Sequence, residues 1–206
     1  MLSLMTSSSP TAGRTQSERT RATTGQLIDA AAALFAADGY SATSLDMVVA
    51  RAGVTKGALY HHFQGKQDLF AAVYEREQRS LAEVVQAAHG RKRDSWDGFY
   101  AGCRAFLEAS LDPGVQRITL LDAPMALGWR RMREVEARYS MALLEAGLHQ
   151  AIAAGRIAAR PVEPLAHLLF GALCEAAMMV ARSEDQKTAT RRSLAELKSL
   201  LDGIAL

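Results

Sequence analysis

The chain has 206 residues, of which 49% are apolar and 22% are charged, and its formal net charge at pH 7 is +2. This composition excludes an intrinsically disordered protein, and the length suits one large domain or two small ones. The near balance of charge also excludes any argument for nucleic-acid binding from composition alone, so such an argument depends on where the basic residues lie.

The opening of the sequence, its cysteines and its longest apolar run predict a cytoplasmic protein. The opening MLSLMTSSSPTAGRTQ lacks the basic segment and long apolar run of a secretory signal peptide, so we expect residues 1–17 to form a flexible tail. Cys103 and Cys174 lie in apolar helical patterns without a paired-cysteine spacing, which predicts reduced, buried thiols. The longest apolar run, residues 164–180, contains a histidine and a glutamate, so we expect no membrane span.

The N-terminal part of the chain shows four segments with the apolar spacing of helices. A stop signal at Asp38-Gly39 ends the first of them. Thr43 and Ser44 are candidate N-caps of the second, Gly53 ends it, and Thr55 caps the third. The predicted helices cover residues 20–37, 45–52, 56–63 and, after a glycine, 66–89.

The rest of the chain is also predicted to be helical. Gly90 and the basic run at 91–93 interrupt the pattern, and Asp112-Pro113-Gly114 and Pro124 punctuate it further on. We see neither a strand pattern nor an internal repeat, so the predicted fold class is all-α. The expected helices cover about 94–111, 115–122, 127–154, 163–182 and 186–204.

The second and third helices, joined by a tight glycine turn, form a predicted helix-turn-helix, and the first completes a three-helix unit. On the third helix Leu59 and Phe63 share a face that must be buried. The opposite face carries small or hydrogen-bonding side chains and no carboxylate, which would be repelled by phosphate. This face is suited to DNA.

Each residue type on this face has a possible contact with DNA. Thr55 and the first amides of the helix form a positive N-terminus that can hold a phosphate. Gly57 lets the backbone approach the groove, and Lys56 can meet a phosphate or a guanine edge. Tyr60 can reach the backbone or a thymine methyl, and Lys66 can bind the same backbone.

The run TSLDMVVARAGVTKGALYHHFQGKQDLF, residues 43–70, resembles the N-terminal domain of the TetR family of transcriptional regulators. The resemblance implies an all-helical homodimer that places two recognition helices in successive major grooves of a near-palindromic operator. It also implies a ligand cavity in a divergent C-terminal domain. Carried over to this sequence, the DNA contacts fall on Thr43, Thr55, Lys56, Gly57, Tyr60, His61 and Lys66.

Plainer interpretations of the same residues stay open. His61 and His62 point about 100° apart on a helix, so they cannot chelate one metal ion as an i, i+4 pair can. His61 is then a candidate phosphate contact, and His62 is expected to pack or bond locally. Tyr60 could instead cover the edge of the core, and Lys66 could be an ordinary solvated lysine.

Aromatic and methionine side chains outside the N-terminal domain gather on three predicted helices. For any single residue, plain core packing is the ordinary interpretation. As a group they predict a cavity for an apolar or amphipathic small molecule, whose identity is unknown. Its candidate residues are Trp96, Tyr100, Cys103, Phe106, Asp122, Trp129, Tyr139, His167, Phe170 and Cys174.

The last two helices are apolar on more than one side, which predicts a homodimer through residues 163–204. We therefore expect a tail at 1–17, a helix-turn-helix domain at 18–66 and a helical ligand-binding and dimerisation domain at 67–206. The favoured function is a repressor released from its operator by ligand, without a cofactor. The alternatives are a dimeric small-molecule-binding protein that does not bind DNA and an enzyme whose site assembles from distant segments.

Overall fold

The computed structural model describes residues 16–206, and in this range the backbone forms helices and turns, with one isolated β-bridge between Ile157 and Ala205. The predicted all-α fold is confirmed. All but the last two residues of the expected tail lie outside the described part. In chain order the elements are α1 (Gln16–Ala42), α2 (Leu45–Ala52), α3 (Lys56–His62), α4 (Lys66–Gly90), α5 (Ser95–Ala109), α6 (Pro113–Gln116), η1 (Arg117–Asp122), α7 (Ala123–Arg138), α8 (Ser140–Ala153), α9 (Val162–Ala181) and α10 (Gln186–Asp202).

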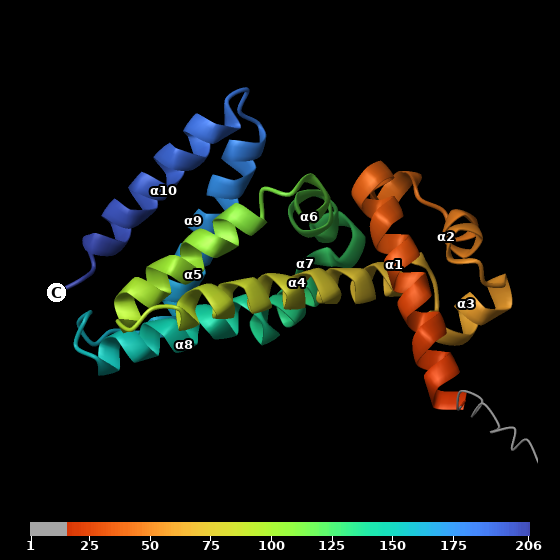
Figure 1. Ribbon diagram of the computed structural model, residues 1–206, viewed down its shortest axis with the longest axis horizontal. Helices are drawn as coiled ribbons and strands as arrows, with labels where there is room; N and C mark the ends of the chain where they lie inside the picture. Colours follow the sequence, from red (N-terminus) through yellow and green to blue (C-terminus); the bar gives the residue numbers. More distant parts are fainter. Residues whose placement is uncertain (1–15) are drawn as a thin grey trace, which may run out of the picture.

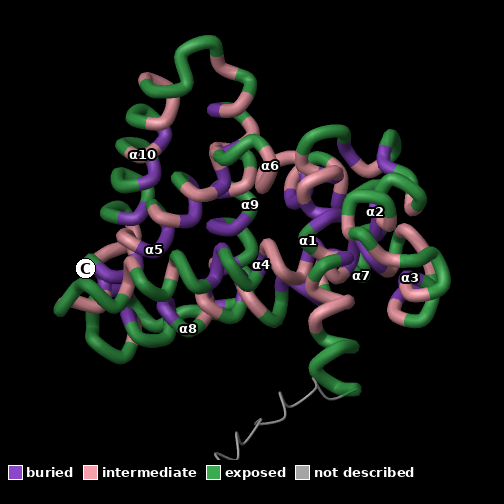
Figure 2. The backbone as a smooth tube through the Cα atoms, turned by 45° about the vertical axis from the view of Figure 1, so that its right-hand side comes forward, coloured by how far each residue is buried: buried purple, intermediate pink, exposed green. Residues whose placement is uncertain are grey.

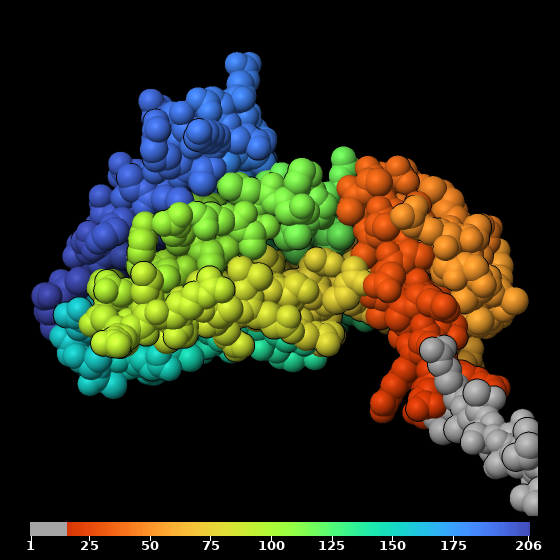
Figure 3. All heavy atoms as spheres, viewed as in Figure 1, coloured from red at the N-terminus to blue at the C-terminus, as the bar shows by residue number. Residues whose placement is uncertain are grey.

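Two groups of helices lie at opposite ends of the molecule, and α4 runs from one to the other (Figure 1). The first group is α1, α2 and α3, and the second contains α5, α8, α9 and α10. The short α6 and η1, together with α7, pack against α1 and α4 between the two groups. The space-filling view shows the first group as a distinct lobe at one end (Figure 3).

The first hydrophobic cluster unites the N-terminal lobe with η1 and α7. At its centre the ring of Phe70 packs edge-on against Phe35 and Tyr40, with both pairs of ring centroids 5.0 Å apart. Ile118 from η1 and Val135 from α7 belong to the same cluster. The core thus crosses the predicted boundary at residues 66 and 67, and that division stays a prediction.

A second cluster fills the other end, between α4, α5, α8, α9 and α10. Its residues are buried along the inner faces of these helices, whereas exposed residues run along the outside of α10 (Figure 2). The predicted single helix at 127–154 is wrong, because the backbone breaks at Tyr139, where φ is −122° and ψ is −88°. This break divides it into α7 and α8.

The end of α1 is locked onto η1. Gly39 has φ +82°, a left-handed conformation that favours glycine, and a Cβ atom there would lie 2.7 Å from Nη1 of Arg117. The adjacent backbone N–H of Tyr40 donates to Oδ2 of Asp122 at 2.7 Å. This bond joins two residues that are 82 positions apart in sequence, whereas the predicted stop signal at Gly39 concerned α1 alone.

Helix α9 is long and apolar enough to cross a membrane by length and composition, whereas no span is expected from the sequence. A single helix of this kind is a weak indication, because core helices of other proteins pass the same test. Only 33% of its most apolar window is buried. Its exposed side chains include Leu168 at 73% and Met179 at 53%.

Candidate nucleic-acid interface and cavity

The local sequence sets the geometry of α2 and α3 through three capping residues. Ser44 Oγ accepts from the N–H of Met47 at 3.2 Å, and Thr55 Oγ1 accepts from the N–H of Ala58 at 3.2 Å. Gly53, with φ +67°, ends α2 in the left-handed conformation. The predicted caps at Ser44 and Thr55 and the glycine turn between the helices are confirmed.

Five of the seven predicted DNA contacts lie together on the exposed face of α3. Leu59 and Phe63 face the core, and Tyr60 is 53% exposed. At Gly57 a Cβ atom would meet only Thr55 Oγ1, at 3.9 Å, so the helix itself does not require glycine there. The exposed group consists of Thr55, Lys56, Gly57, Tyr60 and His61.

A carboxylate of α2 lies beside this face, although the face itself carries none. Asp46, on α2, forms an ion pair with Lys56 at 2.7 Å, and both side chains are largely exposed. The hydrogen bond to Asp46 raises the pKa of the Lys56 ammonium. Any phosphate that binds Lys56 must therefore compete with Asp46.

The paired histidines have separate surroundings. His62 Nδ1 lies 3.3 Å from Thr24 Oγ1 on α1, so the expectation that this residue bonds locally is confirmed. His61 is exposed, and the two rings are 5.1 Å apart and nearly perpendicular. Among residues 16–206 we find no group of three or more His, Cys, Asp or Glu side chains that could hold a metal ion.

The other two predicted contacts, Thr43 and Lys66, have structural roles. Thr43 is 1% exposed and its Oγ1 donates to the carbonyl of Gly39 at 2.8 Å, which corrects the expectation that its side chain faces DNA. Lys66 Nζ donates to the carbonyls of Tyr40 and Thr43 at 2.8 and 3.0 Å. It also lies 4.4 Å from the centroid of the Tyr40 ring. Through these contacts Lys66 holds the turn between α1 and α2 in place. A phosphate contact by Lys66 stays a prediction.

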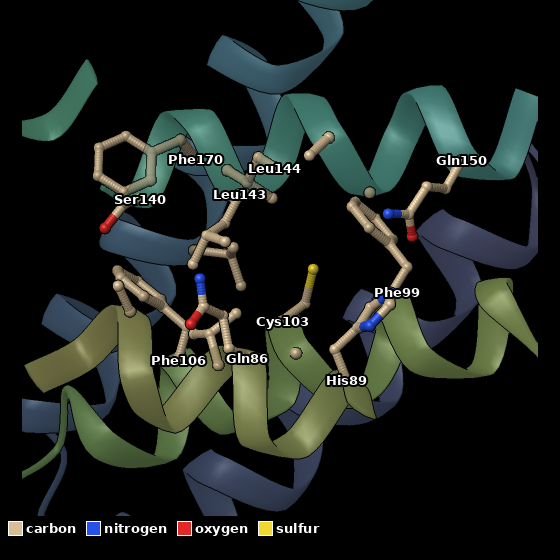
Figure 4. Close-up of a pocket in the computed structure, with 16 residues that line it drawn as sticks. Gln86, His89, Phe99, Cys103, Phe106, Ser140, Leu143, Leu144, Gln150 and Phe170 are labelled. Atoms are coloured by element: carbon tan, nitrogen blue, oxygen red, sulfur yellow. The ribbon is translucent and has the colours of Figure 1, made fainter. Parts of the chain in front are cut away.

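A cavity of about 270 Å³ opens in the second cluster, enclosed by α4, α5, α8 and α9. Polar groups lie at both ends of the cavity (Figure 4): His89 and Gln150 at one, and Ser140, beside Phe170, at the other. The amide of Gln86 lies between them. No Asp, Glu, Lys or Arg is among the wall residues. These are Ala82, Val85, Gln86, His89, Phe99, Gly102, Cys103, Phe106, Ser140, Leu143, Leu144, Ala146, Gly147, Gln150, Phe170 and Leu173.

Three of the ten predicted ligand contacts, Cys103, Phe106 and Phe170, lie on this wall, and their binding of a ligand stays a prediction. Burial raises the pKa of the Cys103 thiol to about 12, so it is neutral at physiological pH. The sequence reasoning missed Gln86, His89, Ser140 and Gln150. Gln86 and His89 could have been found from their spacing, because it places them on the same face of α4 as Ala82.

The other seven predicted residues lie elsewhere. The expectation that Trp129 lines a cavity is wrong, because its indole is 65% exposed and stacks on the guanidinium of Arg133. Asp122 and Tyr139 are bonded to the backbone of Tyr40 and to Glu75 respectively. Of the remaining four, Trp96 stacks on Phe99 behind the cavity wall, and Tyr100 faces Lys198 of α10. His167 is exposed and Cys174 is half-buried.

Comparisons with known proteins cover both ends of the molecule. Residues 27–73 match the family model described as bacterial regulatory proteins, tetR family, and residues 96–204 match that of the tetracyclin repressor-like C-terminal domain. The solved structure of a TetR-family transcriptional regulator from Pectobacterium atrosepticum is 35% identical, with a TM-score of 0.80 over 94% of this chain and 98% of that one.

Two further relatives are more distant. The Transposon Tn10 TetC protein of Escherichia coli is 26% identical over 156 residues, which cover 76% of this chain and 79% of that protein. RolR, solved in complex with the ligand resorcinol, has a TM-score of 0.67 at 18% identity, over 92% of this chain and 95% of its own. At that identity the likeness shows the fold alone.

Proposed function

The chain belongs to the TetR family of DNA-binding transcriptional regulators, and from this premise we propose that it is a repressor released from a near-palindromic operator by a small ligand. The observation that carries the proposal is the exposed face of α3. It gathers a helix N-terminus, a lysine, a bare glycine backbone, a tyrosine and a histidine on one surface. Family members are regulators rather than enzymes, so we propose that this chain is not an enzyme. We also propose that it acts in the cytoplasm.

A selection of random-sequence duplexes by the purified protein tests this function. We expect an inverted repeat to be enriched and the affinity for it to fall steeply as salt rises. Lys56→Ala should weaken binding to every sequence, whereas Arg130→Ala, which removes a 94% exposed side chain on α7, should not. Failure to enrich any sequence, or equal losses in both variants, would contradict α3 as the DNA-reading element.

The cavity supports an uncharged, mainly apolar ligand with a hydrogen-bonding end. Its wall has no acidic or strongly basic side chain, whereas the amide of Gln150 and the imidazole of His89 lie near one end and the amide of Gln86 lies between the two ends (Figure 4). At about 270 Å³ it lies just below the usual range for ligand pockets, about 300–1,000 Å³. Resorcinol, the ligand of RolR, is small, uncharged and hydroxylated, so it is the first probe to titrate.

The dimer that a palindromic operator requires is proposed to form through α9 and α10. Leu168 and Met179 on α9 and Leu200 on α10 are at least half exposed, so these two helices offer large apolar side chains that a second copy of the chain would cover. Leu168→Arg should convert a dimer to a monomer in sedimentation velocity and remove operator binding. Leu121→Arg, at a side chain that is also 50% exposed but lies on η1, is the matched control and should remain dimeric.

A further inference from the structure

A continuous chain of hydrogen bonds starts at the cavity wall and ends on α7. Ser140 Oγ donates to Gln78 Oε1 at 2.8 Å, and Gln78 Nε2 donates to the hydroxyl of Tyr74 at 3.2 Å. The Tyr74 hydroxyl donates in turn to Glu136 Oε1 at 3.1 Å, and Arg133 Nη1 donates to Glu136 Oε2 at 3.0 Å. We call these five residues the polar relay.

Four members of the polar relay are buried, so they depend on one another, and the fifth, Arg133, is partly exposed. Tyr74 and Gln78 are 0 and 3% exposed, and Glu136 and Ser140 are 5 and 7% exposed. A buried polar group that loses its partner costs about 1–3 kcal/mol, since water does not replace the lost bond. A change at one end of the polar relay is therefore felt by the next member.

The polar relay crosses the break between α7 and α8. Glu136 lies in the last turn of α7, and Ser140 is the first residue of α8. Tyr74 and Gln78 are one helical turn apart on α4, so the two sides of the break are fastened to adjacent positions of the same helix. The α4 helix in turn leads directly into the DNA-binding lobe (Figure 1).

The two ends of the polar relay lie in different functional surroundings. Ser140 is part of the cavity wall, at the end that also holds Phe170 (Figure 4). The helix of Glu136 is fastened to the first turn of α4, because the carbonyl of Ala126 accepts from Gln67 Nε2 at 2.7 Å and Arg131 pairs with Asp68 at 3.2 Å. It also packs on the DNA-binding lobe, since Val135 shares a hydrophobic cluster with Phe35 of α1. A contact with Ser140 and the position of α7 are thus linked through four hydrogen bonds.

We infer that the polar relay couples the cavity to the DNA-binding lobe, an inference that rests on the proposed function. The Ser140 hydroxyl has one proton, which either Gln78 or an oxygen of a ligand can accept. A ligand oxygen that accepts the hydrogen bond of this hydroxyl leaves Gln78 without its partner and loosens α7 from α4. The Ser140 hydroxyl is bonded either to Gln78 or to the ligand, so the two arrangements are discrete, as a switch requires. Bound DNA favours the first arrangement and bound ligand favours the second. Ser140, Gln78 and Tyr74 are in this sense positioning residues.

Because coupling is reciprocal, it can be tested from the DNA side, with the full chain and the duplex enriched by selection. We would measure amide hydrogen exchange with and without this duplex. DNA should slow exchange in α3 and also in α8 of the wild-type protein, the latter by roughly fivefold or more, the lower end of typical coupling between sites. In Ser140→Ala the protection of α3 should remain and that of α8 should fall below roughly twofold.

Two variants separate coupling from stability. Ser110→Ala removes a buried hydroxyl that has no hydrogen-bond partner, so it should behave as wild type. Ser140→Thr keeps the hydroxyl and should restore the response of α8. Protection of α3 without any response of α8 in the wild type, or an unchanged response in Ser140→Ala, would overturn the inference. Absence of protection at α3 itself would refute the proposed function and the inference with it.

Discussion

The two hydrophobic clusters of this molecule are built differently. In the first, Phe35 and Phe70 are fully buried and their rings pack edge-on against each other. The second leaves a cavity beside Cys103 and exposes Leu168 on its outer surface. A surface that must match the spacing of DNA grooves requires a rigid core, whereas a cavity that admits ligands requires one with spare room.

The largest expected effect tests this contrast in packing. Leu69→Ala, in the closed first cluster, should lower the free energy of unfolding by about 4 kcal/mol, because the removed atoms leave a void. Leu173→Ala, on the cavity wall, should cost only about 2 kcal/mol, since one side of this leucine already faces empty space. Urea denaturation at one fixed protein concentration measures both. Equal losses would remove the contrast between the clusters.

A second prediction concerns the polar anchor of the first cluster. Lys66→Met keeps most of the side-chain length but leaves the carbonyls of Tyr40 and Thr43 without their charged donor. We expect a loss of about 2 kcal/mol in unfolding free energy, the usual contribution of a hydrogen bond to a charged group. The same urea titration detects it. Unchanged stability together with weakened DNA binding would instead assign Lys66 to the operator.

Gly57→Ala should separate stability from DNA binding. The new methyl group meets no close neighbour in the free protein, and alanine favours a helix over glycine by about 1 kcal/mol, so the unfolding free energy should rise. Operator affinity should fall about tenfold if the backbone lies against the groove, as measured by fluorescence anisotropy. An unaltered affinity would show that DNA does not approach this part of α3.

The smallest effect is a pH dependence at the contact between the two clusters. Burial raises the pKa of the Glu136 carboxyl, although Arg133 and Tyr74 oppose the shift. The folded state therefore binds this proton more tightly than the unfolded state, and the wild type loses stability as pH rises through the raised pKa. Glu136→Gln resembles the protonated acid, so its stability relative to wild type should improve as the pH rises above about 4, the ordinary pKa of a glutamate. A relative stability that declines over this range would contradict the sign of the shift.

The local features of the fold could be predicted from the sequence. Ser44, Gly53 and Thr55 specify the caps and the turn of the helix-turn-helix through bonds to residues at most four positions away. The apolar spacing likewise located α2, α3 and α4. These features depend on contacts between residues that are close in the sequence, so the order of residues is enough to predict them.

The remaining features depend on contacts between distant segments. The break at Tyr139 has neither glycine nor proline, and the bond between Tyr74 and Glu136 joins residues 62 positions apart. The ring of Trp129 was assigned to a cavity because aromatic residues are usually buried, but Arg133 covers it at the surface. No periodic pattern in the sequence reveals the helix break, the distant hydrogen bond or the exposed tryptophan. For the same reason the cavity wall could be predicted only in part.

The close approach at Gly39 has a consequence for how such proteins recombine. The DNA-reading segment completes its core with Ile118 and Val135, and the end of its first helix is hydrogen-bonded to Asp122 of η1. A chimera cut after α4 would lose these partners, even though the cut falls between two recognisable families of domain. For this chain the exchangeable unit includes η1 and α7, so a new sensor grafted onto this DNA reader must begin beyond residue 138 or reproduce that surface.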